Sequence, residues 1–169
     1  MAKAMTRHDA QLLPLSFTLN GRVQELDVEP HELLLDVVRD RLGLTGAKRS
    51  CDVQVCGACT LLVDGRPVSA CTTLAFEIRG CSVLTIEGLA EKNGKLHPLQ
   101  EAFIEHGGFQ CGFCTPGMIL AAKALLDENA APSEAELKHF MHGNICRCTG
   151  YKKIIESIMA AAKKMRGNA

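Results

Sequence analysis

The sequence lacks several features that would place it in a common functional class. It has no Trp and only one Tyr, so few aromatic rings could stack on nucleic-acid bases. Its 19 Lys and Arg balance its 19 Asp and Glu, and this neutrality argues against binding to nucleic acids or anionic membranes. No apolar run approaches membrane-spanning length, and no G-x-G-x-x-G motif is present. We therefore expect no nucleic-acid partner, no membrane insertion and no flavin domain within this chain.

Residues 1–14 are polar, with neither an apolar core of signal-peptide length nor a twin-Arg pair. This pattern predicts a cytoplasmic protein, and disulfides rarely persist in the cytoplasm. The composition nevertheless includes nine Cys. An odd number of cysteines also fits a disulfide framework poorly. Metal binding or redox chemistry is therefore the leading explanation for these residues.

The beginning of the chain predicts a β-hairpin followed by a helix. Apolar and polar residues alternate over 15–28 around an Asn20-Gly21 pair, which is typical of a hairpin with a tight turn. Pro30 then precedes an apolar stripe that runs to Leu42 and stops at Gly43. This pattern predicts a helix with Pro30 near its first turn.

A second hairpin is expected over 60–70 around Asp64-Gly65, and a last strand over 81–86. A hairpin, a crossing helix and further strands indicate an α+β fold. We predict a β-grasp domain of the plant-type ferredoxin kind over 14–90, after an N-terminal extension of residues 1–13.

The second half of the chain predicts helices. Residues 91–97 turn polar and form the expected linker. Residues 98–169 are then expected to form an all-α domain resembling a four-helix bundle. The first helix is expected over 98–106 and the last over 151–165. The second is expected to run to about residue 129, with Thr115 as its N-cap and Pro116 at its first position. The third is expected after a capping box that begins at Ser133.

Four of the cysteines form a first set whose spacing is informative. The first three follow C-x4-C-x2-C, and the fourth lies on the next expected hairpin. This is the spacing of plant-type [2Fe–2S] ferredoxins, in which four thiolates hold two sulfide-bridged irons. Gly57 and Ala58 leave room near the sulfurs. Zinc is the alternative, although zinc loops more often pair two C-x2-C units. The set is Cys51, Cys56, Cys59 and Cys71.

Four further cysteines form a second set, a C-x2-C followed by a C-x-C. Residues two apart cannot share a helix face, so the C-x-C is expected in a turn or at a helix end, and Gly143 and Gly150 flank it. Zinc remains open for this set, and C-G-F-C alone also resembles a thioredoxin-type redox pair. The set is Cys111, Cys114, Cys146 and Cys148. Cys81 is left over and is expected to be a small buried apolar residue.

Taken together, these motifs resemble the small iron–sulfur subunit of the molybdenum hydroxylases, the family of xanthine oxidase, aldehyde oxidoreductase and carbon monoxide dehydrogenase. The resemblance covers roughly residues 15–162. The segments that carry it are CDVQVCGACT at 51–60, DG at 64–65, SAC at 69–71, QCGFCTPGM at 110–118 and GNICRCTGY at 143–151. The last two, in this order and separation, are the most specific.

The resemblance implies a role for each set. Cys51, Cys56, Cys59 and Cys71 would hold a distal, more exposed [2Fe–2S] cluster nearer to a flavin. The second set would hold a proximal cluster at the interface with a molybdenum-binding subunit. Gln110 and Cys148 would contact the molybdopterin cofactor there. In the commoner family pattern glycines stand where this chain has Ser50, Asp52 and Gln54.

The function that the resemblance implies is electron transfer within a multisubunit oxidoreductase. Electrons would pass from molybdopterin on a large subunit through the two clusters to FAD on a medium subunit or to another acceptor. This chain would hold no catalytic residue and no substrate-binding site. The expected assembly is a heterotrimer, alone or dimerised. The alternatives are a zinc-stabilised interaction module and a stand-alone ferredoxin-like shuttle. An apolar surface around Gln110 and Phe113 would favour the subunit over the shuttle.

Overall fold

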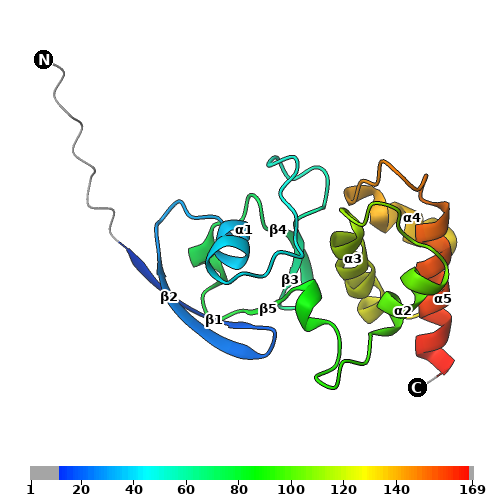
Figure 1. Cartoon of the computed structure of the whole chain (residues 1–169), viewed down its shortest axis with the longest axis horizontal. Helices are drawn as coiled ribbons and strands as arrows, with labels where there is room; N and C mark the ends of the chain where they lie inside the picture. The colour runs from blue at the N-terminus through cyan, green and yellow to red at the C-terminus, as the bar shows by residue number, and fades with distance from the viewer. Residues whose placement is uncertain (1–11, 168–169) are drawn as a thin grey trace, which may run out of the picture.

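The structure, a computed structural model, describes residues 12–167, and it combines one sheet with several helices (Figure 1). The sheet has five strands in the order β2-β1-β5-β3-β4. Strand β5 runs parallel to β1 and antiparallel to β3. The strands are β1 (Leu13–Leu19), β2 (Arg22–Val28), β3 (Thr60–Val63), β4 (Arg66–Ser69) and β5 (Ser82–Leu84). The expected extension 1–13 lies almost wholly outside the described residues, and Leu13 already belongs to β1.

Both expected hairpins are present. In the first, Leu15, Phe17 and Leu19 of β1 are buried, while alternate residues are more exposed. Its turn, Asn20-Gly21, has φ values of 51° and 77°, the left-handed backbone that a two-residue hairpin turn requires. Asp64-Gly65 adopts the same conformation between β3 and β4. Burial thus alternates with period two in β1, whereas Thr60, Leu61 and Leu62 of β3 are all buried, so that strand is covered on both faces.

The expected helix over 30–42 is shorter and irregular. Helix α1 spans only Leu34–Asp36, and a π-helical segment, η1, continues over Val37–Arg41. The start is late because Leu33 forms an isolated antiparallel bridge with Leu74 and so stays extended. Pro30 consequently lies in a turn before the helix. The apolar stripe is still buried, and it includes Val37 and Val38.

The remaining helices lie in the second half, as expected. They are α2 (Pro98–Glu105), α3 (Thr115–Glu128), α4 (Glu134–Phe140) and α5 (Lys152–Gly167). Short 3-10 turns occur in both halves, namely η2 (Ala75–Ile78), η3 (Ile86–Gly88) and η4 (Met141–Gly143). Ser133 and Glu136 form the expected capping box at α4. The prediction for α3 was wrong in one detail, because Cys114 and not Thr115 is its N-cap. No helix among residues 12–167 is long and apolar enough to cross a membrane.

Helix α3 connects the two halves of the molecule. Figure 1 shows it between the sheet and the other helices. Its Leu120 and Ala124 belong to the apolar core under the sheet, whereas Met118 and Leu125 belong to the core among the helices. One helix thus contributes to both cores, and this fixes the sheet relative to the helices. The result is a mixed α/β molecule with a five-stranded sheet and several helices.

Candidate metal centres

The structure brings the first cysteine set together. Cys51, Cys56 and Cys59 lie in the loop between η1 and β3, and Cys71 follows β4. The thiols form pairs, Cys51 beside Cys56 and Cys59 beside Cys71, and Cys56 is also near Cys59. Cys59 and Cys71 are buried, whereas Cys51 and Cys56 are half-buried. The set therefore has one inner and one outer pair.

Backbone N–H groups of this loop point at a sulfur. The backbone N–H groups of Val53, Val55 and Cys56 hydrogen-bond to Cys51 and lower its pKa to about 6, with Val55 N at 3.4 Å from the sulfur. The inner pair differs, since burial raises the pKa of Cys59 to about 12. Donors aimed at a sulfur suit a thiolate, because an N–H group stabilises negative charge.

This loop reaches its shape through left-handed backbone. Asp52 and Gln54 have φ values of 55° and 60° although neither is glycine. Gly57 has a φ of 69°. The side chain of Asn144 fills the space next to it, and a Cβ added at Gly57 would clash, lying 2.4 Å from Nδ2 of Asn144. The room expected near Gly57 is therefore taken up by the loop of the second set.

The structure also brings the second set together. The sulfurs of Cys111 and Cys148 are 3.6 Å apart, and both residues are exposed. Cys114 lies beside Cys146, which is buried. Burial raises the pKa of Cys114 to about 12. Of the two glycines expected to shape the C-x-C turn, Gly150 has a φ of 62°, but nothing lies within 4 Å of a Cβ at Gly143.

Cys146 has a polar environment of its own. The hydroxyl of Thr149 donates to its sulfur over 3.2 Å, and its backbone N–H donates over 3.1 Å to the hydroxyl of Tyr151. Burial alone would raise the pKa of Cys146, but the pKa is lowered overall because hydrogen bonds from Thr149, Cys148 and Cys114 together outweigh burial. Sequence reasoning missed Thr149, because only the turn after Cys148 brings its side chain back to Cys146.

The loops of the two sets touch each other. Ile145 donates its backbone N–H to the carbonyl oxygen of Cys56 over 2.8 Å. The buried side chain of Asn144 donates to the carbonyl oxygen of Gly57 over 3.1 Å. Figure 1 shows the loops around residues 48–59 (cyan) and 143–151 (orange) at the same upper edge. Sequence reasoning missed Asn144, because this contact joins residues far apart in the chain.

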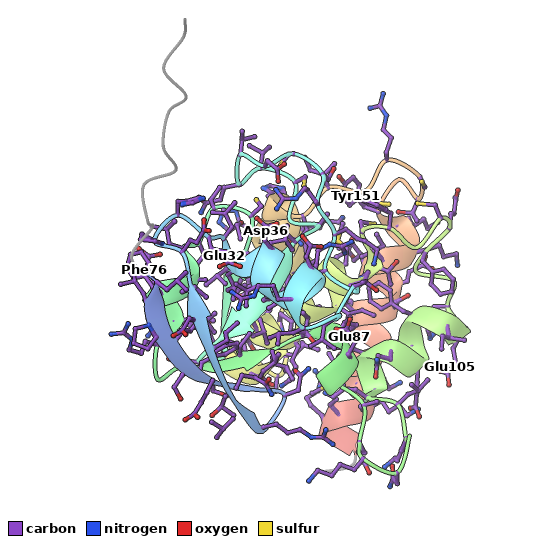
Figure 2. All side chains as sticks on the ribbon, turned by 60° about the vertical axis from the view of Figure 1, so that its left-hand side comes forward. Glu32, Asp36, Phe76, Glu87, Glu105 and Tyr151 are labelled. Atoms are coloured by element: carbon purple, nitrogen blue, oxygen red, sulfur yellow. The ribbon has the colours of Figure 1, made fainter. Side chains whose placement is uncertain are left out.

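Exposed large apolar side chains stand close in sequence to the four cysteines of the second set. They are Phe109, Phe113, Ile145 and Tyr151, which are 40%, 46%, 44% and 39% exposed. Gln110 is also exposed. Figure 2 shows Tyr151 in the upper part of that view, near the orange loop. An exposed apolar surface around Gln110 and Phe113 favours a subunit of a complex over a free shuttle.

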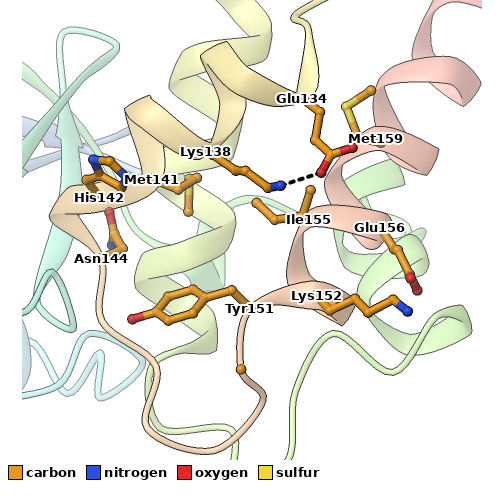
Figure 3. Close-up of a pocket in the computed structure, with 11 residues that line it drawn as sticks. Glu134, Lys138, Met141, His142, Asn144, Tyr151, Lys152, Ile155, Glu156 and Met159 are labelled. Atoms are coloured by element: carbon orange, nitrogen blue, oxygen red, sulfur yellow. Dashed lines mark ion pairs between the residues drawn. The ribbon is translucent and has the colours of Figure 1, made fainter.

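A cavity of about 930 Å3 lies beside this surface, between α4 and α5 (Figure 3). Met141, Ile155 and Met159 line it together with Tyr151. An ion pair between Lys138 and Glu134 lies at its side. The exposed apolar surface thus continues into a concave region with charged residues at its border.

The donor chemistry of the two sets fits two-iron clusters. Each iron of a [2Fe–2S] cluster takes two thiolates and two bridging sulfides, so four thiolates are needed in two pairs. Both sets offer such pairs. Within residues 12–167 no three His, Cys, Asp or Glu side chains converge on a single-ion site. Cys81 belongs to neither set, and it is half-buried against the sheet core and not fully buried as expected.

Comparisons with known proteins agree on one group of relatives. Residues 23–104 match the family described as 2Fe-2S iron-sulfur cluster binding domain, and residues 85–159 match the [2Fe-2S] binding domain family. The nicotinate dehydrogenase small FeS subunit of Eubacterium barkeri is 45% identical, over 90% of this chain and 96% of its own. The aldehyde oxidoreductase of Megalodesulfovibrio gigas is 47% identical over 89% of this chain, which spans only 17% of that protein.

Solved structures share the fold. A chain of quinoline 2-oxidoreductase from Pseudomonas putida 86 superimposes with a TM-score of 0.88 and 47% identity. The match covers 93% of this chain and 98% of that chain. The mixed α/β arrangement described above is therefore also that of a solved protein.

Proposed function

This chain belongs to the family of small [2Fe–2S] subunits of the molybdenum hydroxylases, and we propose that it conducts electrons within such an oxidoreductase complex. The main observation in support is that eight thiols lie in two sets of four, and each set consists of two neighbouring pairs. When bound, a [2Fe–2S] cluster supplies one-electron redox chemistry. The protein holds the clusters, excludes water from part of each and sets the reduction potential.

We assign one cluster to each set. Cys51, Cys56, Cys59 and Cys71 hold the distal cluster, and Cys111, Cys114, Cys146 and Cys148 hold the proximal cluster. The paired thiols support this assignment, as do the N–H groups that point at Cys51. The low pKa of Cys51 and the hydrogen bonds to Cys146 favour thiolates at these positions.

We propose that electrons enter through the proximal cluster and leave through the distal cluster. The hydrogen bond from Ile145 to the carbonyl of Cys56 supports a path between the two clusters, because it joins a residue next to ligand Cys146 to a ligand of the other set. The entry would lie at the exposed pair Cys111 and Cys148. The final acceptor would be FAD on a medium subunit or another acceptor.

We propose that the exposed apolar surface binds a large molybdopterin-binding subunit. Phe109, Phe113 and Ile145 would be buried there, and Gln110 and Cys148 would contact the pterin. Burial of apolar side chains on association stabilises a permanent complex. The complex would be a heterotrimer, alone or dimerised. A cytoplasmic location suits nine free cysteines.

We also propose a two-domain organisation. Residues 14–90 would form a β-grasp domain and residues 98–169 a helical bundle, joined by the linker 91–97. The separate apolar cores under the sheet and among the helices support the division. Helix α3, which contributes to both cores, would hold the domains in a fixed arrangement.

Metal and sulfide analysis of the anaerobically purified chain tests the function. We expect about four iron and four sulfide per chain and a visible spectrum that dithionite bleaches. Cys59→Ser and Cys114→Ser should each reduce the iron content to about two per chain. Cys81→Ser is the matched control, because Cys81 lies in neither set, and it should keep the full iron content.

Two outcomes would contradict the proposal. One is stoichiometric zinc without visible colour in a chain shown not to have lost clusters to oxygen. The other is a loss of iron in Cys81→Ser equal to that in Cys59→Ser. The first outcome would favour a zinc-stabilised module, and the second would overturn the assignment of ligands.

A further inference from the structure

Cys146 receives a hydrogen bond of a kind that no other cysteine sulfur of the described region receives. Thr149 Oγ1 lies 3.2 Å from its sulfur. Within residues 12–167 this is the only hydroxyl that donates to a cysteine sulfur, whereas Cys51 is contacted by backbone N–H groups. A side-chain donor differs from a backbone donor in one practical respect. It can be removed by substitution without changing the path of the backbone.

The orientation of this hydroxyl is set by its second hydrogen bond. The backbone N–H of Tyr151 donates to Thr149 Oγ1 over 3.2 Å. A hydroxyl has one proton and two acceptor positions. Because the oxygen accepts from Tyr151, the proton remains available for the sulfur of Cys146. A metal-bound thiolate can only accept, so the direction of this hydrogen bond is unambiguous in the loaded protein.

The backbone after Thr149 turns sharply, and this turn allows Tyr151 to hydrogen-bond to Thr149. Gly150 and Tyr151 both have left-handed backbone, with φ values of 62° and 67°. Such a conformation is unusual for a bulky residue, and it tends to occur where function requires it. In this turn the backbone N–H of Tyr151 donates to the hydroxyl oxygen of Thr149. The hydroxyl oxygen of Tyr151 in turn accepts from the backbone N–H of Cys146. Thr149 therefore contacts the sulfur of Cys146, and Tyr151 contacts its backbone N–H.

We propose that Thr149 raises the reduction potential of the proximal cluster by donating a hydrogen bond to its ligand Cys146. The inference rests on the proposed function. Reduction adds one electron, and therefore one negative charge, to a cluster held by four thiolates. A hydrogen-bond donor stabilises the more negative state more strongly. The buried position of Cys146 strengthens this effect, since water screens it less. Thr149 acts through Cys146 and makes the proximal cluster a better acceptor for the entering electron.

The test is a redox titration of the full chain with both clusters in place, followed by electron paramagnetic resonance. Thr149→Val replaces the hydroxyl by a methyl group of similar shape. At fixed ambient potential we expect the reduced-to-oxidised ratio of one cluster to fall by up to about tenfold. A tenfold change corresponds to about 59 mV for a one-electron couple. The potential of the other cluster should stay unchanged and serves as an internal reference.

Two variants control the experiment. Thr149→Ser keeps the hydroxyl and should restore the wild-type potential. Thr72→Val is the matched control at the other set, because Thr72 adjoins Cys71 but donates to oxygen atoms of Gln54 and Ser69. It should leave both potentials unchanged. A merely structural role of Thr149 would not predict a shift in one potential with rescue by serine.

Several results would overturn the inference. Iron and sulfide are measured first, since a wild-type chain without clusters would contradict the proposed function instead. Given intact clusters, unchanged potentials in Thr149→Val would refute the inference, and so would equal shifts of both clusters. Thr149→Ala is the second variant. If both the valine and the alanine variants lose iron while the serine variant retains it, Thr149 is needed for assembly and the proposal is wrong.

Discussion

At the scale of single residues, the loop of the first set carries side chains where left-handed backbone favours glycine. Asp52 and Gln54 have φ values of 55° and 60°. Left-handed backbone costs a residue with a Cβ about 1 kcal/mol or more. This is the physical reason that the commoner pattern of the family has glycines here. For Asp52, the ion pair with Arg49 offsets part of that cost.

Substitution of Gln54 tests this account. Gln54 is exposed, so packing changes little. Gln54→Val places a β-branched side chain in left-handed backbone and should destabilise the loaded protein by about 1–2 kcal/mol. Gln54→Gly should be within about 1 kcal/mol of the wild type. The measurement is the denaturant midpoint at which the visible absorbance disappears. Equal midpoints for the valine and glycine variants would mean that this backbone is not strained.

At the scale of elements, helix α2 begins with an unusual cap. His97 is its N-cap, and Nδ1 of the ring accepts the backbone N–H of Leu99 over 3.2 Å. The ring must be neutral to accept. Burial lowers the pKa of His97 below its usual 6.5, and Lys123 adds to this against the opposing effects of Asp127 and Glu101.

A defined pH dependence follows from this cap. The pKa of His97 is lower in the folded than in the unfolded chain, so unfolding takes up a proton at mildly acidic pH. The contribution of His97 to stability is therefore complete above about pH 6.5 and is lost as the pH falls below it. His97→Asn keeps a capping oxygen and cannot titrate. Its denaturant midpoint should fall less between pH 7.5 and 5.5 than that of the wild type, and parallel falls would refute the account.

In the molecule as a whole, the sheet half and the helical half pack closely where Gly117 of α3 meets Gly57 of the first cysteine loop. A Cβ at Gly117, in α3, would lie 2.2 Å from the carbonyl oxygen of Gly57. That atom belongs to the backbone and cannot move aside as a flexible side chain could. The contact brings α3 against the loop of the first set, next to the hydrogen bonds from Asn144 and Ile145. The arrangement of the two metal centres therefore depends on close backbone packing.

Gly117→Ala should separate these surfaces. We expect a loss of about 2 kcal/mol or more in unfolding free energy, because an added methyl group in a packed contact forces the backbone to shift. Gly143→Ala is the matched control. Its Cβ would meet nothing within 4 Å, and its backbone is not left-handed. Thermal unfolding of the loaded chain compares the two variants. A Gly117→Ala variant as stable as Gly143→Ala would contradict the described packing.

Features that depend on local spacing could be predicted from the amino-acid sequence alone. The spacings within each cysteine motif, the hairpins at Asn20-Gly21 and Asp64-Gly65, and the capping box at Ser133 all follow from residues that are near one another in the chain. Turn chemistry and period-two alternation operate over a few residues, so they can be read without a fold. The family resemblance likewise rests on contiguous motifs.

Features that join residues far apart in the chain became visible only in the folded molecule. The late start of α1 depends on the bridge between Leu33 and Leu74. The pairing of thiols and the use of Gly57 by Asn144 depend on how the sheet and the helices pack. The contact of Thr149 with Cys146 depends on a left-handed turn at Tyr151, a conformation that the residue type disfavours. Local preferences cannot reveal such contacts, because they are fixed by packing across the whole molecule.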